Sequence, residues 1–107
     1  MDRNEMNLVH RLGECVYMCN MCFAACLEED DVAMMTGCIR LDKECAAICG
    51  AALQNVYGDN WYRKDMLKLC RKVCEDCAEE CGKFSQDHCR RCAKACQDCA
   101  DACAEFI

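Results

Sequence analysis

The sequence predicts an all-α fold, an antiparallel up-down-up-down four-helix bundle with a cysteine-lined core. The chain of 107 residues has no proline and only five glycines, so its loops must be few and short. Turn-forming residues gather at three places and leave four segments long enough for bundle helices. Cysteines recur along these segments at steps of three and four residues, which places them on one face of a helix. Short connections make neighbouring helices antiparallel, and we expect residues 1–107 to form a single domain.

The first predicted helix covers residues 3–28 and carries its cysteines in a 4-3-4 step. These are Cys15, Cys19, Cys22 and Cys26. An acidic cluster at residues 28–31 ends the segment, and its aspartates suit the N-cap of the following helix, either Asp30 or Asp31.

The second predicted helix, 31–56, carries three cysteines, Cys38, Cys45 and Cys49. An alignment with the fourth segment at a shift of 54 residues puts Met35 and Asp42 where that segment has cysteines. The chain therefore resembles a duplicated helical hairpin, with Met35 and Asp42 as substitutions in the cysteine pattern. For Asp42 an outward orientation is favoured over contact with a metal or a basic partner, because a buried carboxylate needs a partner.

The third and fourth predicted helices cover 60–82 and 86–104. Gly58 suits the end of the second helix and Asp59 or Asn60 the start of the third, while Gly82 ends the third and Ser85 caps the fourth. The third helix repeats the 4-3-4 step of the first, displaced by 55 residues, and the fourth has a 3-4-3-4 step. The cysteines are Cys70, Cys74, Cys77 and Cys81, followed by Cys89, Cys92, Cys96, Cys99 and Cys103.

A core that contains sixteen cysteines indicates metal binding. Cysteine is small, so a core made mainly of it is underpacked unless metal ions fill the space. Disulfides fit poorly, since neighbours on one helix have nearly parallel Cα–Cβ bonds. Iron–sulfur clusters need cysteines on loops that wrap the cluster, and a di-iron site needs Glu-x-x-His motifs, which do not occur.

Charge favours Cu(I) over zinc as the bound metal. Thiolates select soft or borderline ions, which makes both candidates. Four Zn²⁺ would neutralise eight of the sixteen thiolate charges, and burial of the remaining eight is very costly. Sixteen Cu(I) ions would leave the core neutral. Sequestration of zinc or cadmium by the same core, and a thiol redox protein, are the alternatives.

The chain resembles the bacterial copper storage proteins, because it is a short four-helix chain whose helices carry repeated C-x-x-x-C motifs, such as Cys15 to Cys19 and Cys70 to Cys74. The resemblance covers essentially the whole chain. It implies a bundle that binds many Cu(I) ions along its core, commonly as a homotetramer, with the sixteen cysteines as thiolate ligands. It also implies that members without an export signal act in the cytosol. The interruption at Asp42 departs from an even cysteine pattern.

The two ends of the predicted bundle differ in chemistry. Antiparallel packing gathers an apolar plug at one end, formed by Leu8, Leu12, Leu53, Val56, Trp61, Met66 and Phe106. The opposite end gathers Met34, Met35 and His88 beside the outermost thiols, and soft thioether and imidazole ligands suit a place where copper enters. We expect His88 and Met35 to be metal ligands, with ordinary packing and solvent exposure as the alternative. His10 is expected on the surface.

Charge and hydropathy limit the other partners. The net charge of −6 argues against nucleic acid and anionic membranes, and no apolar run is long enough to span a bilayer. The first 15 residues carry charges where a secretion signal needs an apolar run, so we expect a cytoplasmic protein. A copper chaperone is a candidate donor. The sequence has no evident nucleophile–base pair or phosphate loop, and no enzymatic activity is expected.

Overall fold

The computed structural model describes residues 1–58 and 60–107, which fold into four long α-helices. They are α1 (Arg3–Leu27), α2 (Thr36–Asn55), α3 (Arg63–Cys81) and α4 (Asp87–Ala104). A 3₁₀ turn, η1 (Val32–Met35), precedes α2 and takes the place of the first turn predicted for the second helix. The predicted all-α four-helix bundle is confirmed.

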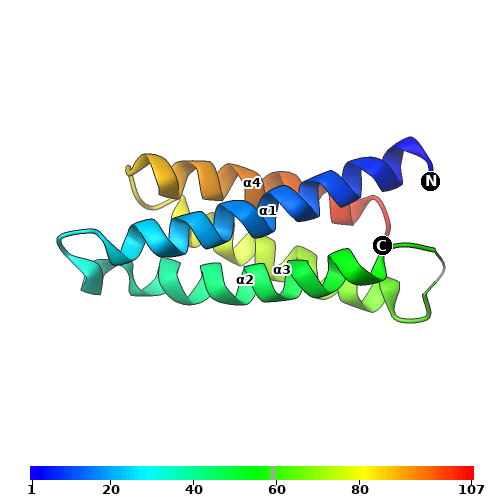
Figure 1. Cartoon of the computed structure of the whole chain (residues 1–107), viewed down its shortest axis with the longest axis horizontal. Coiled ribbons are helices and arrows are strands. Elements are labelled where there is room, and N and C mark those ends of the chain that lie inside the picture. The colour runs from blue at the N-terminus through cyan, green and yellow to red at the C-terminus, as the bar shows by residue number, and fades with distance from the viewer. Residues whose placement is uncertain (59) are drawn as a thin grey trace.

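The helices form a closed ring in which each one packs against two neighbours. α1 contacts α2 and α4, and α3 contacts the same two helices. Figure 1 shows the elongated bundle, with both termini and the α2–α3 connection at one end and η1 with the α3–α4 connection at the other. Its extents are 45 × 21 × 17 Å. One long, narrow core therefore runs along the bundle axis.

The helix boundaries depend on caps that the sequence pattern identified only in part. α1 begins with a capping box, in which the Asp2 carboxylate accepts from the Glu5 amide at 2.8 Å. Asp31 does stand before η1, but its side chain forms no capping hydrogen bond. Gln86, rather than the predicted Ser85, precedes α4, also without a side-chain cap.

The connection between α2 and α3 contains Gly58 in a backbone conformation that other residues rarely adopt. Gly58 has φ of +81°, a left-handed conformation in which an L side chain is strained. Asn60 does not cap α3; its amide donates to the Asn55 carbonyl oxygen instead. Asp59, the other cap candidate, lies outside the described residues.

The apolar plug forms at the end that carries the termini, with changes in membership. Leu8, Leu12 and Val56 are buried as predicted. Trp61, however, is 92% exposed, and Leu67 is buried in place of Met66, which is only half-buried. Leu67 lies three residues before Cys70, so it shares the face of the cysteines. In the described part of the chain, no helix has the length and apolarity that crossing a bilayer requires.

Candidate metal centre

All sixteen cysteines are buried in the core and none forms a disulfide. They are contributed by all four helices, and no cysteine lies on the outside of the bundle. The steps of three and four residues explain this, because they keep every thiol on the inward face of its helix. The buried cysteines are Cys15, Cys19, Cys22, Cys26, Cys38, Cys45, Cys49, Cys70, Cys74, Cys77, Cys81, Cys89, Cys92, Cys96, Cys99 and Cys103.

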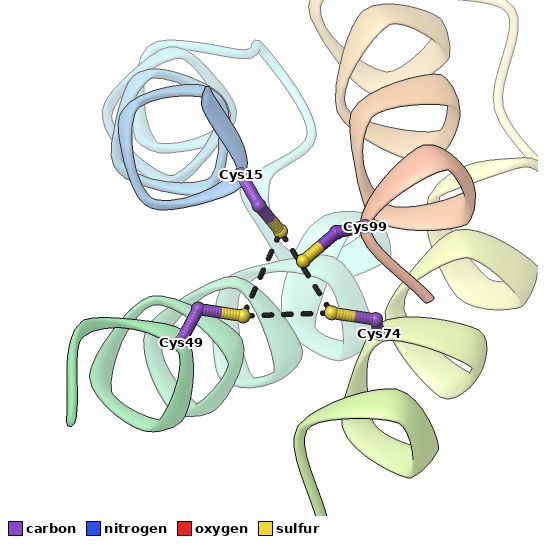
Figure 2. A group of neighbouring side chains, drawn as sticks. All are labelled: Cys15, Cys49, Cys74 and Cys99. Carbon is purple, nitrogen blue, oxygen red and sulfur yellow. Dashed lines mark hydrogen bonds between the residues drawn. The ribbon is translucent and has the colours of Figure 1, made fainter. Parts of the chain in front are cut away.

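Thiols from different helices meet at the bundle axis. Figure 2 shows Cys15, Cys49, Cys74 and Cys99, one from each helix, with their sulfur atoms pointing toward one another. The Sγ atom of Cys49 lies 3.8 Å from that of Cys15 and 3.4 Å from that of Cys74. All four sulfur atoms lie within 4.8 Å of one another. Such a group can place several thiolates around one soft metal ion.

Groups of this kind overlap and form a continuous column. Cys15 also belongs to a group with Cys19, Cys45 and Cys96. Further along the axis, Cys19 and Cys96 join Cys77 and Cys92 in a third group of four. The next groups contain Cys22, Asp42, Cys81 and Cys92, and finally Cys22, Cys26, His88 and Cys89. Neighbouring groups share at least one sulfur atom, so a metal ion bound in one group would lie close to the next.

Burial keeps the outermost thiols protonated in the metal-free protein. It raises the pKa of Cys26 to about 11 and also raises that of Cys89. Because a metal binds the thiolate, loading of the column must release these protons to solvent. These two outer thiols therefore become charged only when a metal ion binds them.

Asp42 corrects one expectation from the sequence. It was expected to face outward, but it is fully buried and accepts from the thiols of Cys92 at 3.3 Å, Cys77 at 3.4 Å and Cys81 at 3.5 Å. Its other oxygen, Oδ2, has no partner among the described residues. The helical period explains the inward position, since Asp42 lies four residues after Cys38 and three before Cys45. The alignment that placed Asp42 within the cysteine pattern therefore agrees with its position.

Asp42 makes the stability of the metal-free protein depend on pH. Burial is the largest cause of the shift that raises the pKa of this carboxyl from 3.8 to about 10. Between these values the folded chain keeps a proton that the unfolded chain releases, so stability falls as pH rises. The substitution Asp42→Asn removes the ionisation and should stabilise the metal-free protein by about 2–4 kcal/mol at pH 7, with a smaller gain near pH 4.

Urea unfolding of the reduced, metal-free chain between pH 4 and pH 8 tests this expectation. Asp101→Asn is the matched control, because Asp101 is exposed on α4 and its replacement should give no such pH-dependent gain. A difference between native and Asp42→Asn protein that stays constant with pH would contradict it.

His88 lies at the end of the column that carries η1. Its Nδ1 atom is 3.5 Å from the sulfur atoms of both Cys22 and Cys89, and 3.9 Å from that of Cys26. Its Nε2 atom lies 2.8 Å from a carboxylate oxygen of Glu29. The side chain is 22% exposed, whereas the three thiols are buried. This end, which we call the mouth of the column, is thus where an imidazole beside the thiols meets solvent.

The other residues predicted at this end divide into two kinds. Met35 is 2% exposed and belongs to the same buried cluster as the cysteines, whereas Met34 is 65% exposed. His10 is exposed at the opposite end, as expected.

The pairing of Glu29 with His88 was not predicted from the sequence, which placed Glu29 only in an acidic turn. The signal was the antiparallel topology, which brings the end of the first helix beside the start of the fourth.

Comparison with known proteins gives one family and several close relatives. The whole chain, residues 1–107, matches the family described as copper storage protein. An uncharacterized cysteine-rich protein of Bacillus subtilis, YhjQ, is 48% identical over 77 residues, which are 72% of this chain and 71% of the relative.

Two solved structures are similar over almost their full length. The Cu(I)-bound copper storage protein BsCsp3, which comes from Bacillus subtilis, is 42% identical, with a TM-score of 0.90 over 96% of this chain and 97% of that one. A cytosolic copper storage protein from Streptomyces lividans, solved with five coppers, is 34% identical, with a TM-score of 0.91 over 96% of this chain and 91% of that one.

Proposed function

The chain belongs to the copper storage protein family, and from that membership we propose that it stores several Cu(I) ions in its bundle core. The observation that carries this function is the column of sixteen buried thiols, none of which forms a disulfide. Thiolates select soft ions. One Cu(I) per thiolate leaves the core neutral, whereas one zinc or cadmium ion per four thiolates leaves two negative charges buried for each ion. The function is storage and involves no catalytic step.

We propose all sixteen cysteines as Cu(I) ligands, with His88 and Met35 as further ligands near the mouth. The overlap of neighbouring thiol groups supports this, since an ion bound in one group can share sulfur ligands with the next. The Nδ1 atom of His88 faces three thiols, and the thioether of Met35 is buried in the same cluster. Both groups suit a soft ion on its way into the core.

Replacement of His88 and Met35 by alanine should slow Cu(I) uptake about tenfold and leave the final capacity almost unchanged, because the core thiols remain. Stopped-flow mixing of the reduced chain with a Cu(I)–chelator complex measures the rate. The matched control replaces His10 and Met6, which are exposed at the opposite end, by alanine. An unchanged rate in the first variant would count against a copper route through the mouth.

We further propose a cytosolic homotetramer that receives copper from a chaperone. The Streptomyces relative, which is described as cytosolic, supports the location. An apolar groove between α2 and α3, lined by Leu41, Ile48, Leu69 and Val73, supports self-association, since Leu69 is about half exposed there. Analytical ultracentrifugation of the reduced chain tests the tetramer, and a monomer at micromolar concentration would contradict it.

Expression of the chain in copper-fed bacterial cells tests the function in its proposed setting. Storage predicts that the chain is recovered from the cytosolic fraction with several copper ions per molecule and reduced thiols. Zinc as the main metal would favour the sequestration alternative. Disulfide-bonded protein without metal would favour a redox role.

A further inference from the structure

The mouth of the column is built differently from the rest of it. Its group consists of three thiols and one imidazole, those of Cys22, Cys26, Cys89 and His88, whereas the four deeper groups named above have four thiols or three thiols and a carboxylate. We call these four residues the mouth site. Three cysteines and one histidine are a ligand set that structural zinc sites use.

Four of the six ligand–ligand distances within the mouth site match a tetrahedral zinc site, and the other two, from the Cys89 sulfur to those of Cys22 and Cys26, are within 4.8 Å. Zn–S bonds of about 2.3 Å and Zn–N bonds of about 2.0 Å imply tetrahedral edges of about 3.8 Å between two sulfurs and about 3.5 Å between sulfur and nitrogen. The Sγ atoms of Cys22 and Cys26 lie 3.8 Å apart. The Nδ1 atom of His88 lies 3.5, 3.9 and 3.5 Å from the sulfurs of Cys22, Cys26 and Cys89. No side chain has to move far to surround one ion.

Charge also selects this site for a divalent ion. One Zn²⁺ with three thiolates and a neutral imidazole carries a net charge of −1. The same ion in a group of four thiolates carries −2 in a fully buried place. Because burial of excess charge is costly, the partly exposed mouth site is the most favourable of these groups for a divalent ion.

Glu29 completes the arrangement from outside. Its carboxylate oxygen lies 2.8 Å from Nε2 of His88, on the side of the ring away from the thiols. When it accepts a hydrogen bond from Nε2–H, the lone pair of His88 is left on Nδ1, which faces the mouth thiols. A carboxylate in this position is the usual orienting partner of a zinc-bound histidine.

We propose that, before copper loads, the mouth site binds one divalent soft or borderline ion, Zn²⁺ by preference, in tetrahedral coordination. Cys22, Cys26, Cys89 and the Nδ1 atom of His88 are its ligands, and Glu29 is a positioning residue. A zinc ion held here lies between solvent and the deeper thiols. Incoming Cu(I) must then displace it, so zinc slows the start of copper loading without lowering the final capacity.

Anaerobic titration of the reduced, metal-free chain with Co²⁺, a visible probe of tetrahedral thiolate sites, tests this proposal. We expect saturation at about one Co²⁺ per chain, with an absorption spectrum typical of tetrahedral cobalt–thiolate coordination and its loss when Zn²⁺ is added. His88→Ala should weaken Co²⁺ binding at least about tenfold and shift the spectrum, and Glu29→Ala should weaken it with no change in ligand number. Circular dichroism verifies that each variant is folded.

Two matched controls isolate the site. His10→Ala removes an exposed histidine at the far end, and Glu28→Ala removes an exposed carboxylate beside Glu29; neither should change Co²⁺ affinity. Absence of a tetrahedral spectrum, saturation near four ions per chain, or an unchanged affinity in both His88→Ala and Cys89→Ser would overturn the proposal. No copper is present in this experiment, so its failure leaves the storage function standing, and its success does not depend on that function.

Discussion

Replacement of the four cysteines of Figure 2 by serine is expected to lower the Cu(I) capacity by about four ions per chain, because each buried thiolate neutralises one Cu(I). The variant changes Cys15, Cys49, Cys74 and Cys99. Cys15 is also a member of the adjacent group, so retention of the ions there should weaken as well. Anaerobic titration against a competing Cu(I) chelator measures both the capacity and the retention.

The control for this variant adds buried hydroxyls without removing sulfur. It changes four buried alanines, Ala52, Ala95, Ala100 and Ala102, to serine. This control should keep the full copper capacity if it folds, which far-ultraviolet circular dichroism establishes.

Should the fourfold cysteine variant fail to fold, the pair Cys49→Ser and Cys74→Ser removes two thiols that lie 3.4 Å apart and should lower the capacity by about two ions. An unchanged capacity would mean that these thiols hold no copper.

Copper loading should raise the thermal unfolding midpoint of the chain by about 20 °C or more. Each ion that binds the folded chain at a free concentration 100-fold above its dissociation constant contributes about 2.7 kcal/mol, and several ions act together. In a domain of this size 1 kcal/mol shifts the midpoint by roughly 4–8 °C, and copper bound by the unfolded thiols reduces the total. Differential scanning calorimetry of metal-free and loaded protein under anaerobic conditions measures the shift.

The fourfold cysteine variant supplies the comparison for this second experiment. It retains twelve cysteines and should show a smaller rise in the midpoint than the native chain. A native chain whose midpoint does not move on loading would show that copper binds outside the folded core or equally well to the unfolded chain. Either outcome would contradict the assignment of the core thiols as the copper store.

The helical period was sufficient to predict most of the fold and the thiol column. Steps of three and four residues determine which face of each helix turns inward, and every cysteine that follows them is buried. The same period, applied strictly, places Asp42 and Leu67 inside. The error at Asp42 came from the cost of a buried carboxylate, which a retained proton and three thiol donors offset.

A periodic pattern of residues could not predict the features that depend on the connections between helices. Trp61 is hydrophobic but follows the α2–α3 turn, where no helix covers it, and it is exposed. The pairing of Glu29 with His88 joins residues 59 positions apart and required the packing of two helix ends. The 3₁₀ turn of η1 likewise reflects how the chain enters α2, and it leaves Met35 buried and Met34 exposed.

The core thiols are expected to bind Cu(I) and to hold it tightly. Anaerobic titration of the reduced native chain with Cu(I), in the presence of a competing Cu(I) chelator, tests this expectation most directly. The thiol column predicts about one Cu(I) per cysteine, with strong retention against the chelator and unchanged helicity. Saturation at one or two ions would leave most of the sixteen thiols without a role and would contradict copper storage.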